Sequence, residues 1–241
     1  MEIKIVSKKI KSKKPVVIEG FPGVGLVGSI AAKYLSQQLK AKQIGFIESP
    51  HLPPVSFIVN GEAYNPIRIY ESEENNLVIV ESEFPVPKEL IYDLGEKIAD
   101  WSKEIKAEKV ICLEGINTPQ PKGGTGVFAI TSDKKFKTPK TIKKVETGYM
   151  IGVSASLMLQ CKEIKLPGLC LMAETHSKFP DGMAAAAIIT ELNKLLSLKI
   201  DVKPLEKEAK TFENKLKTLV EKAKGLQNKT DIKPDDKVIY G

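Results

Sequence analysis

Residues 15–35 read PVVIEGFPGVGLVGSIAAKYL, and they contain the strongest indication of the protein's architecture. Residues 15–19 form a short apolar run that is typical of a buried strand. After a glycine-rich turn, apolar residues recur at helical spacing over residues 26–39. The segment therefore predicts a strand, a tight loop and a helix, which is the first unit of an α/β fold.

The loop carries a GxGxxG pattern at Gly23, Gly25 and Gly28. Between a strand and a helix, with Glu48 at the end of the next expected strand, this pattern is typical of a dinucleotide site. The same glycines also suit a tight turn and close packing of the helix on the sheet. We favour packing, because Pro22 is unusual before the first fingerprint glycine, and we expect no cofactor. A P-loop is excluded because no Gly-Lys-Ser/Thr follows.

The rest of residues 1–200 alternates strand-like and helix-like runs, which predicts one α/β domain with a mainly parallel sheet and helices on both faces. The expected strands are short apolar or β-rich runs at residues 43–48, 57–59, 67–70, 77–80, 110–113, 127–130 and 166–173. The expected helices lie at residues 87–101, 152–159 and 184–198, the proline- or glycine-rich loops at 49–54 and 115–126, and the turns at 60–61 and 75–76.

The sequence pattern changes over the last forty or so residues, where the alternation of strand-like and helix-like runs ends. Apolar residues follow a heptad pattern over residues 201–226, with lysine and glutamate between them. This predicts a helix that either packs on its own domain or pairs between subunits. Residues 227–241 begin with a polar stretch without periodicity, which predicts a flexible tail.

Charge and composition disfavour several classes of function. The net charge is +7, yet Arg68 is the only arginine, so a lysine-rich solvated surface explains the excess better than nucleic-acid readout does. Cys112, Cys161 and Cys170 are odd in number and widely spaced, and we interpret them as free thiols of a cytoplasmic protein. With no histidine or cysteine at ligand spacing we expect no metal, and with no long apolar run we expect no membrane segment.

One group of polar residues could serve catalysis. His176 lies in the sequence ETHS, where Glu174 and His176 could act as an acid–base pair with Ser177 or Ser154 as nucleophile. The nucleophile elbow GxSxG is absent around Ser154, so a hydrogen-bonded turn explains the ETHS sequence better. Asp181 fits a helix N-cap rather than a catalytic acid.

The chain ends in Ile239, Tyr240 and Gly241. One pocket can bind all three, because the aliphatic side chain buries apolar area, the tyrosine stacks and hydrogen-bonds, and the carboxylate pairs with a lysine or with backbone donors. The linker before them can reach at most roughly 35–40 Å. We therefore predict that this tripeptide binds a partner.

Four segments resemble the proteasome assembly chaperone family, in its archaeal branch. They are EGFPGVGLVG at residues 19–28, SPHLPP at 49–54, GVS at 152–154 and PDGMAAA at 180–186, and the likeness covers residues 10–198. The resemblance implies an α/β/α sandwich similar to nucleoside phosphorylases but without their catalytic residues, without a cofactor and with homo-oligomeric assembly.

The resemblance also implies a partner. Some archaeal members of the family end in a hydrophobic–Tyr–any tripeptide that enters the groove between α-subunits of the 20S proteasome, and Ile239, Tyr240 and Gly241 match that pattern. We therefore expect a cytoplasmic, ATP-independent assembly chaperone or activator, not an enzyme, that binds the 20S core or its α-subunits through this tail.

Two other functions stay open. A nucleoside phosphorylase- or hydrolase-like enzyme would use the loop at residues 20–28 for phosphate and Glu174 or His176 for acid–base chemistry. A nucleic-acid-binding protein would use the lysine excess, and its binding would depend steeply on salt.

Overall fold

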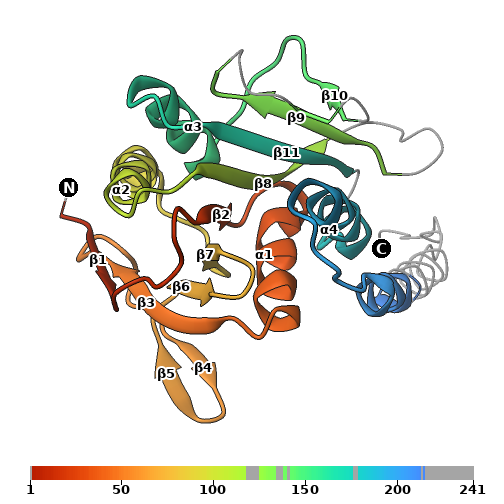
Figure 1. The fold of residues 1–241 in the computed structure, drawn as a ribbon. Helices are drawn as coiled ribbons and strands as arrows, with labels where there is room; N and C mark the ends of the chain where they lie inside the picture. The colour runs from red at the N-terminus through yellow and green to blue at the C-terminus, as the bar shows by residue number, and fades with distance from the viewer. Residues whose placement is uncertain are drawn as a thin grey trace, which may run out of the picture.

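The computed structural model describes residues 2–117, 125–133, 138–139, 142–175, 179–212 and 214. Within them the chain forms one large sheet, a separate two-stranded sheet, and helices on both faces of the large sheet (Figure 1). The predicted α/β class is confirmed.

The helices and strands have the following bounds. The helices are α1 (Val27–Gln38), α2 (Ile91–Glu104), α3 (Val153–Glu163) and α4 (Gly182–Leu196), and the short 3-10 turns η1 (Val24–Leu26) and η2 (Lys88–Leu90) lead into α1 and α2. The large sheet consists of β1 (Lys4–Ser7), β2 (Val16–Gly20), β3 (Lys42–Glu48), β6 (Ile67–Ser72), β7 (Leu77–Ser82), β8 (Lys109–Asn117), β9 (Val127–Thr131), β10 (Lys143–Lys144) and β11 (Gly168–Thr175). The small sheet pairs β4 (Phe57–Val59) with β5 (Glu62–Tyr64).

The centre of the large sheet is parallel, whereas its flanks contain antiparallel pairs, with β9 and β10 parallel to each other at one edge. The strand order is β1-β3-β6-β7-β2-β8-β11-β9-β10, and the parallel strands β7, β2, β8 and β11 are apolar runs buried on both faces. The prediction of a mainly parallel sheet is wrong for β1, β3 and β6, and for β9 beside β11, which pair antiparallel. A short turn at Asn76 joins β6 to β7, and only antiparallel neighbours can be joined so tightly.

Each face of the large sheet carries its own pair of helices. Helices α1 and α4 pack on one face, where Ile18, Ile79 and Leu113 belong to one apolar cluster. Helices α2 and α3 pack on the other face, around Val17 and Val80. Successive residues of a strand therefore enter opposite cores, as the pleat requires.

Most predicted elements are present, and the differences have physical causes. Strand β8 continues through Asn117, although the sequence predicts a loop from residue 115. Strand β11 begins at Gly168, after Pro167, because proline has no N–H to donate to the ladder. The sequence pattern missed β1, β5 and β10, which are short, largely exposed strands without an apolar run.

The predicted C-terminal helix begins on the domain itself. Residues 203–212 are helical, and within them Leu205 and Ala209 are buried. Ala209 packs against Gly182 at the start of α4, where an added Cβ would lie 2.9 Å from the Ala209 Cβ. The later heptad positions and residues 227–241 lie outside the described residues, so pairing of this helix between subunits stays a prediction.

Candidate functional site

The carboxyl ends of the central parallel strands meet at the glycine loop, where open α/β sheets usually bind ligands. Here the protein's own atoms lie against the loop. A Cβ on Gly28 would lie 2.2 Å from the Leu113 carbonyl oxygen, and a Cβ on Gly23 would lie 2.4 Å from a Glu114 carboxylate oxygen. Gly25 has a left-handed φ of 64°. Close packing and turn geometry therefore account for the three fingerprint glycines.

The acidic residue of the dinucleotide pattern lies in the wrong strand. Glu48 ends β3, and β6 and β7 separate β3 from β2 in the sheet. In a dinucleotide fold the acidic residue follows the strand beside the one that leads into the glycine loop, from which it reaches the ribose. The fingerprint is therefore matched in sequence but not in space.

Two carboxyl groups share one serine hydroxyl beneath the loop. Ser154, in the first turn of α3, places its Oγ 2.8 Å from Glu19 Oε2 and 2.7 Å from Glu114 Oε1. Glu19 and Ser154 are fully buried, and Glu114 is nearly so. A hydroxyl has one proton to donate, so the second contact requires a protonated carboxyl as the donor. With both contacts made as hydrogen bonds, one of the two glutamates carries a proton and donates it to Ser154.

Burial explains why this proton stays in place. Burial, reinforced by the nearby charge of Glu114, raises the pKa of Glu19 to about 8. Burial also raises the pKa of Glu114 to about 7, against the lowering effect of its hydrogen bond with Ser154. Acids shifted in this way mark functional sites in many proteins, and they also occur in structural networks.

The residues considered for catalysis do not form a catalytic group among the described residues. The hydroxyl of Ser154 is fully buried and hydrogen-bonded to two carboxyls, so it cannot reach a substrate. Glu174 accepts a hydrogen bond from the Gly126 N–H at 3.0 Å, and its own N–H donates to the Gly126 carbonyl at 2.8 Å. Glu174 therefore fixes the start of β9, whereas His176 and Ser177 lie outside the described residues.

Asp181 has the predicted role of a helix cap. Its Oδ1 accepts from the Ala184 N–H at 2.9 Å at the start of α4, and its Oδ2 accepts from Thr175 Oγ1 at 2.7 Å. Its own N–H donates to the Gly25 carbonyl at 2.9 Å. Asp181 thereby joins α4, β11 and the glycine loop.

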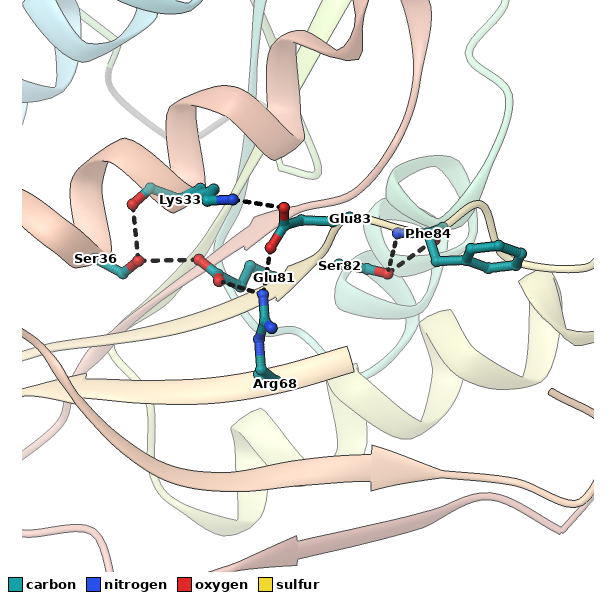
Figure 2. Close-up of polar contacts among 7 residues, drawn as sticks. All are labelled: Lys33, Ser36, Arg68, Glu81, Ser82, Glu83 and Phe84. Carbon is teal, nitrogen blue, oxygen red and sulfur yellow. Dashed lines mark hydrogen bonds and ion pairs between the residues drawn. The ribbon is translucent and has the colours of Figure 1, made fainter. Parts of the chain in front are cut away.

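A second polar cluster lies where β7 ends, and Figure 2 shows its members turned toward one another. Arg68 Nη2 lies 3.2 Å from Glu81 Oε1 and 2.5 Å from Glu83 Oε1. Lys33 Nζ lies 2.6 Å from Glu83, and Ser36 Oγ donates to Glu81 at 3.0 Å. Two cations therefore balance two carboxylates. We name these five residues the Arg68 cluster.

The Arg68 cluster supports the small β4–β5 sheet through an aromatic ring. The Arg68 guanidinium carbon lies 4.3 Å from the centroid of the Phe57 ring, and Lys33 Nζ lies 5.2 Å from it. Sequence reasoning noted Arg68 only as evidence against nucleic-acid binding. Its position between two buried isoleucines, Ile67 and Ile69, was the available sign that its charge needs buried partners.

Ile239, Tyr240 and Gly241 lie outside the described residues. Within the described ranges, no group of three or more His, Cys, Asp or Glu residues is placed to hold a metal ion. In the same part of the chain, no helix combines the length and apolar character that a bilayer-spanning segment needs.

These features define a class of protein, a layered α/β protein whose glycine loop packs closely against its own strands. The chain belongs to the PAC2 family, whose profile matches residues 17–220. The family resemblance predicted from the sequence is confirmed. The match includes the glycine loop, the Arg68 cluster and α4 but stops before the final tripeptide.

Solved structures and a relative of similar length agree with this assignment. The crystal structure of Pyrococcus furiosus PbaA, described as an archaeal homolog of proteasome-assembly chaperone, matches with a TM-score of 0.83 at 30% identity, over 95% of this chain and 96% of that one. Pyrococcus furiosus PbaB, described as an archaeal proteasome activator, matches with a TM-score of 0.78 at 26% identity, over 90% and 98%. The uncharacterized protein MJ0106 of Methanocaldococcus jannaschii is 30% identical over 95% of both chains.

Proposed function

We propose that this protein is an ATP-independent proteasome assembly chaperone or activator that acts in the cytoplasm on the 20S core or its α-subunits. The observation that supports this most strongly is the match to PbaA along nearly the whole of both chains, with PbaB as a second match. The glycine loop fits the same proposal, because its close packing removes the main argument for a nucleotide cofactor.

The proposed contact is made by Ile239, Tyr240 and Gly241. Their chemistry supports insertion into a groove: an aliphatic side chain and an aromatic ring bury apolar area, while the terminal carboxylate pairs with a lysine of the partner. A single tripeptide binds weakly. If the body is a homo-oligomer, several tails act together and avidity exceeds single-tail affinity by ~10²–10⁴.

The test is a pull-down of 20S core particles and of free α-subunits with the full chain and with a chain that ends at Val238. We expect binding by the full chain and its loss on truncation, while the oligomer mass is unchanged. Tyr240→Ala should weaken binding, and Asp236→Asn, in the linker, is the matched control that should not. Equal binding by the truncated chain would refute the role of the tail.

A second candidate is an enzyme with a nucleoside phosphorylase-like fold. One observation favours it: two buried glutamates with raised pKa values lie at the carboxyl ends of β2 and β8. Nucleosides and inorganic phosphate should then raise the melting temperature, and Glu114→Gln should abolish the shift. The enclosure of Ser154 and the packed glycine loop support the chaperone instead, for which no such shift is expected.

A further inference from the structure

A small hairpin projects from one end of the molecule. We name residues 55–64 the arm; it contains β4 and β5 and extends away from the large sheet between β3 and β6 (Figure 1). Ile58 is 61% exposed, and Val55 and Val59 are also exposed. An isolated two-stranded hairpin is only marginally stable. Exposed apolar side chains on such a hairpin therefore indicate a surface that binds a partner.

The arm is held in shape before any partner arrives. At its base, the Phe57 ring packs on the charged groups of Arg68 and Lys33. At its tip, Asn60 and Gly61 have φ values of 51° and 83°, the left-handed pair that a tight two-residue hairpin turn requires. A rigid apolar projection loses little conformational freedom on binding, which favours association.

A matching hollow lies at the other end of the sheet. We name it the groove; it has a volume of about 890 Å³ and lies between α3, the end of β9 and the segment that leads into β11. That volume falls within the range of pockets that enclose small molecules, about 300–1,000 Å³, and a small molecule of that kind is comparable in size to a few side chains. Leu159 is 63% exposed and Tyr149 100% exposed in its lining, which also contains Ile130, Met150, Met158 and Leu166.

Charge complements shape. The groove lining contains Lys162, Lys165 and Asp133 and so has a positive balance of charge, whereas Glu62 is the only charged residue of the arm. Copies of a chain with a net charge of +7 repel one another in general, so an acidic arm beside two lysines supplies a local attraction that selects this contact.

We propose that the arm of one copy inserts into the groove of a second copy. The arm and the groove lie toward opposite edges of the nine-stranded sheet, so the contact joins two different surfaces. When two copies are joined in this way, one copy still has an unoccupied groove and the other an unused arm. Repetition of such a head-to-tail contact closes a ring when the rotation between copies permits. The inference rests on the self-association part of the proposed function and makes no use of the tail.

Sedimentation of the full chain over a concentration series tests the contact. The wild-type chain should form a closed oligomer, and Ile58→Asn or Leu159→Asn should each raise the dissociation constant by about 10-fold or more, because apolar burial is lost and a neutral amide is buried in its place. Val6→Asn, at an exposed apolar residue of β1, is the matched control and should retain the oligomer. Circular dichroism and a melting curve verify that each variant folds.

Cross-linking shows which surfaces meet. A mixture of Ile58→Cys and Leu159→Cys chains should give a disulfide-linked dimer on oxidation, while either variant alone gives much less. A monomeric wild-type chain, an oligomer that survives both asparagine substitutions, or efficient linkage of Ile58→Cys to itself would overturn the proposal. A chain that ends at Val238 should keep the oligomer, so failure of the tail mechanism and failure of the arm contact are distinguishable.

Discussion

The Glu19 carboxyl and the Ser154 hydroxyl lie 2.8 Å apart, and neither residue has exposed surface. Their contact ties β2, at the centre of the sheet, to the first turn of α3. The same hydroxyl lies 2.7 Å from Glu114 on β8, so β2, β8 and α3 are joined through three polar groups that share two protons, one of the hydroxyl and one of a carboxyl. Burial raises the pKa of both carboxyls in the folded state. The protonation of the pair is therefore coupled to folding.

The first prediction is that the free energy of unfolding falls as the pH rises. Folded-state pKa values of about 8 for Glu19 and about 7 for Glu114 exceed their ordinary value of 4.5. The folded state therefore binds more protons than the unfolded state above pH 4.5, and the stabilisation present below that pH is lost as the pH rises through 7 and 8. Urea unfolding should show a slope of up to about 1.4 kcal/mol per pH unit for each extra proton.

Glu19→Gln isolates this effect, because the amide keeps the shape of the side chain and donates a hydrogen to Ser154 without titrating. We expect a flatter pH profile and a more stable protein at alkaline pH. Glu74→Gln, at an exposed turn residue, is the control and should leave the profile as it is. An equally steep fall in Glu19→Gln would show that other groups carry the dependence.

The second prediction concerns the glycine loop. Gly28→Ala should destabilise the protein by about 1–3 kcal/mol or more, since the new methyl group meets the Leu113 carbonyl, a backbone atom that cannot rotate away. Gly148→Ala is the control, because the nearest atom to its Cβ is Val145 Cγ1 at 3.6 Å. Chemical denaturation compares the two. A neutral Gly28→Ala would leave a ligand as the remaining reason for glycine at this position.

Local patterns were sufficient to predict the parallel centre of the sheet. Strands β2, β7 and β8 contain apolar runs because both of their faces are covered, and these runs locate the strands, although β7 and β8 continue beyond them into polar residues. The strand order was not predictable in the same way, because pairing between β2 and β7 depends on residues far apart in the chain. For this reason Glu48 looked like part of a dinucleotide site although two strands separate it from the loop.

The contacts of the candidate site were less predictable than the fold. Asp181 could be assigned as a cap because its bond to Ala184 is local. The contact between Glu19 and Ser154 spans 135 positions, and nothing near either residue indicates the other. The placement of single charged residues, such as Glu19 and Arg68, within apolar strands was a sign of buried polar partners from which the sequence reasoning drew no prediction.

The third prediction concerns the cap of α4. Asp181→Ala should cost about 1 kcal/mol for the lost bond to the Ala184 N–H, with a further loss for the hydrogen bond that Thr175 donates to Asp181. Asp181→Asn retains an acceptor for the cap and should recover most of the stability. Thermal unfolding of both variants provides the measurement, and equal loss in both would show that the negative charge, rather than the hydrogen bond, is what matters.

The fourth prediction concerns the Arg68 cluster and the arm that it supports. Arg68→Ala leaves the buried Glu81 carboxylate without its cation and should destabilise the protein by about 3–5 kcal/mol. Lys11→Ala removes an exposed ion pair with Glu73 and should change the stability by less than about 1 kcal/mol. These two variants separate buried from exposed charge in the same fold.

The same substitution should loosen the arm more than the sheet. Phe57 would lose the guanidinium on which its ring packs, and a two-stranded hairpin without such support is marginal. Limited proteolysis should therefore cut within residues 55–64 faster in Arg68→Ala than in wild type, under conditions where the rest of the fold persists. Arg68→Lys keeps a charge but lacks the flat guanidinium, so it should restore part of the stability and little of the protection. Cleavage at wild-type rate in Arg68→Ala would mean that the arm is held by something other than this ring.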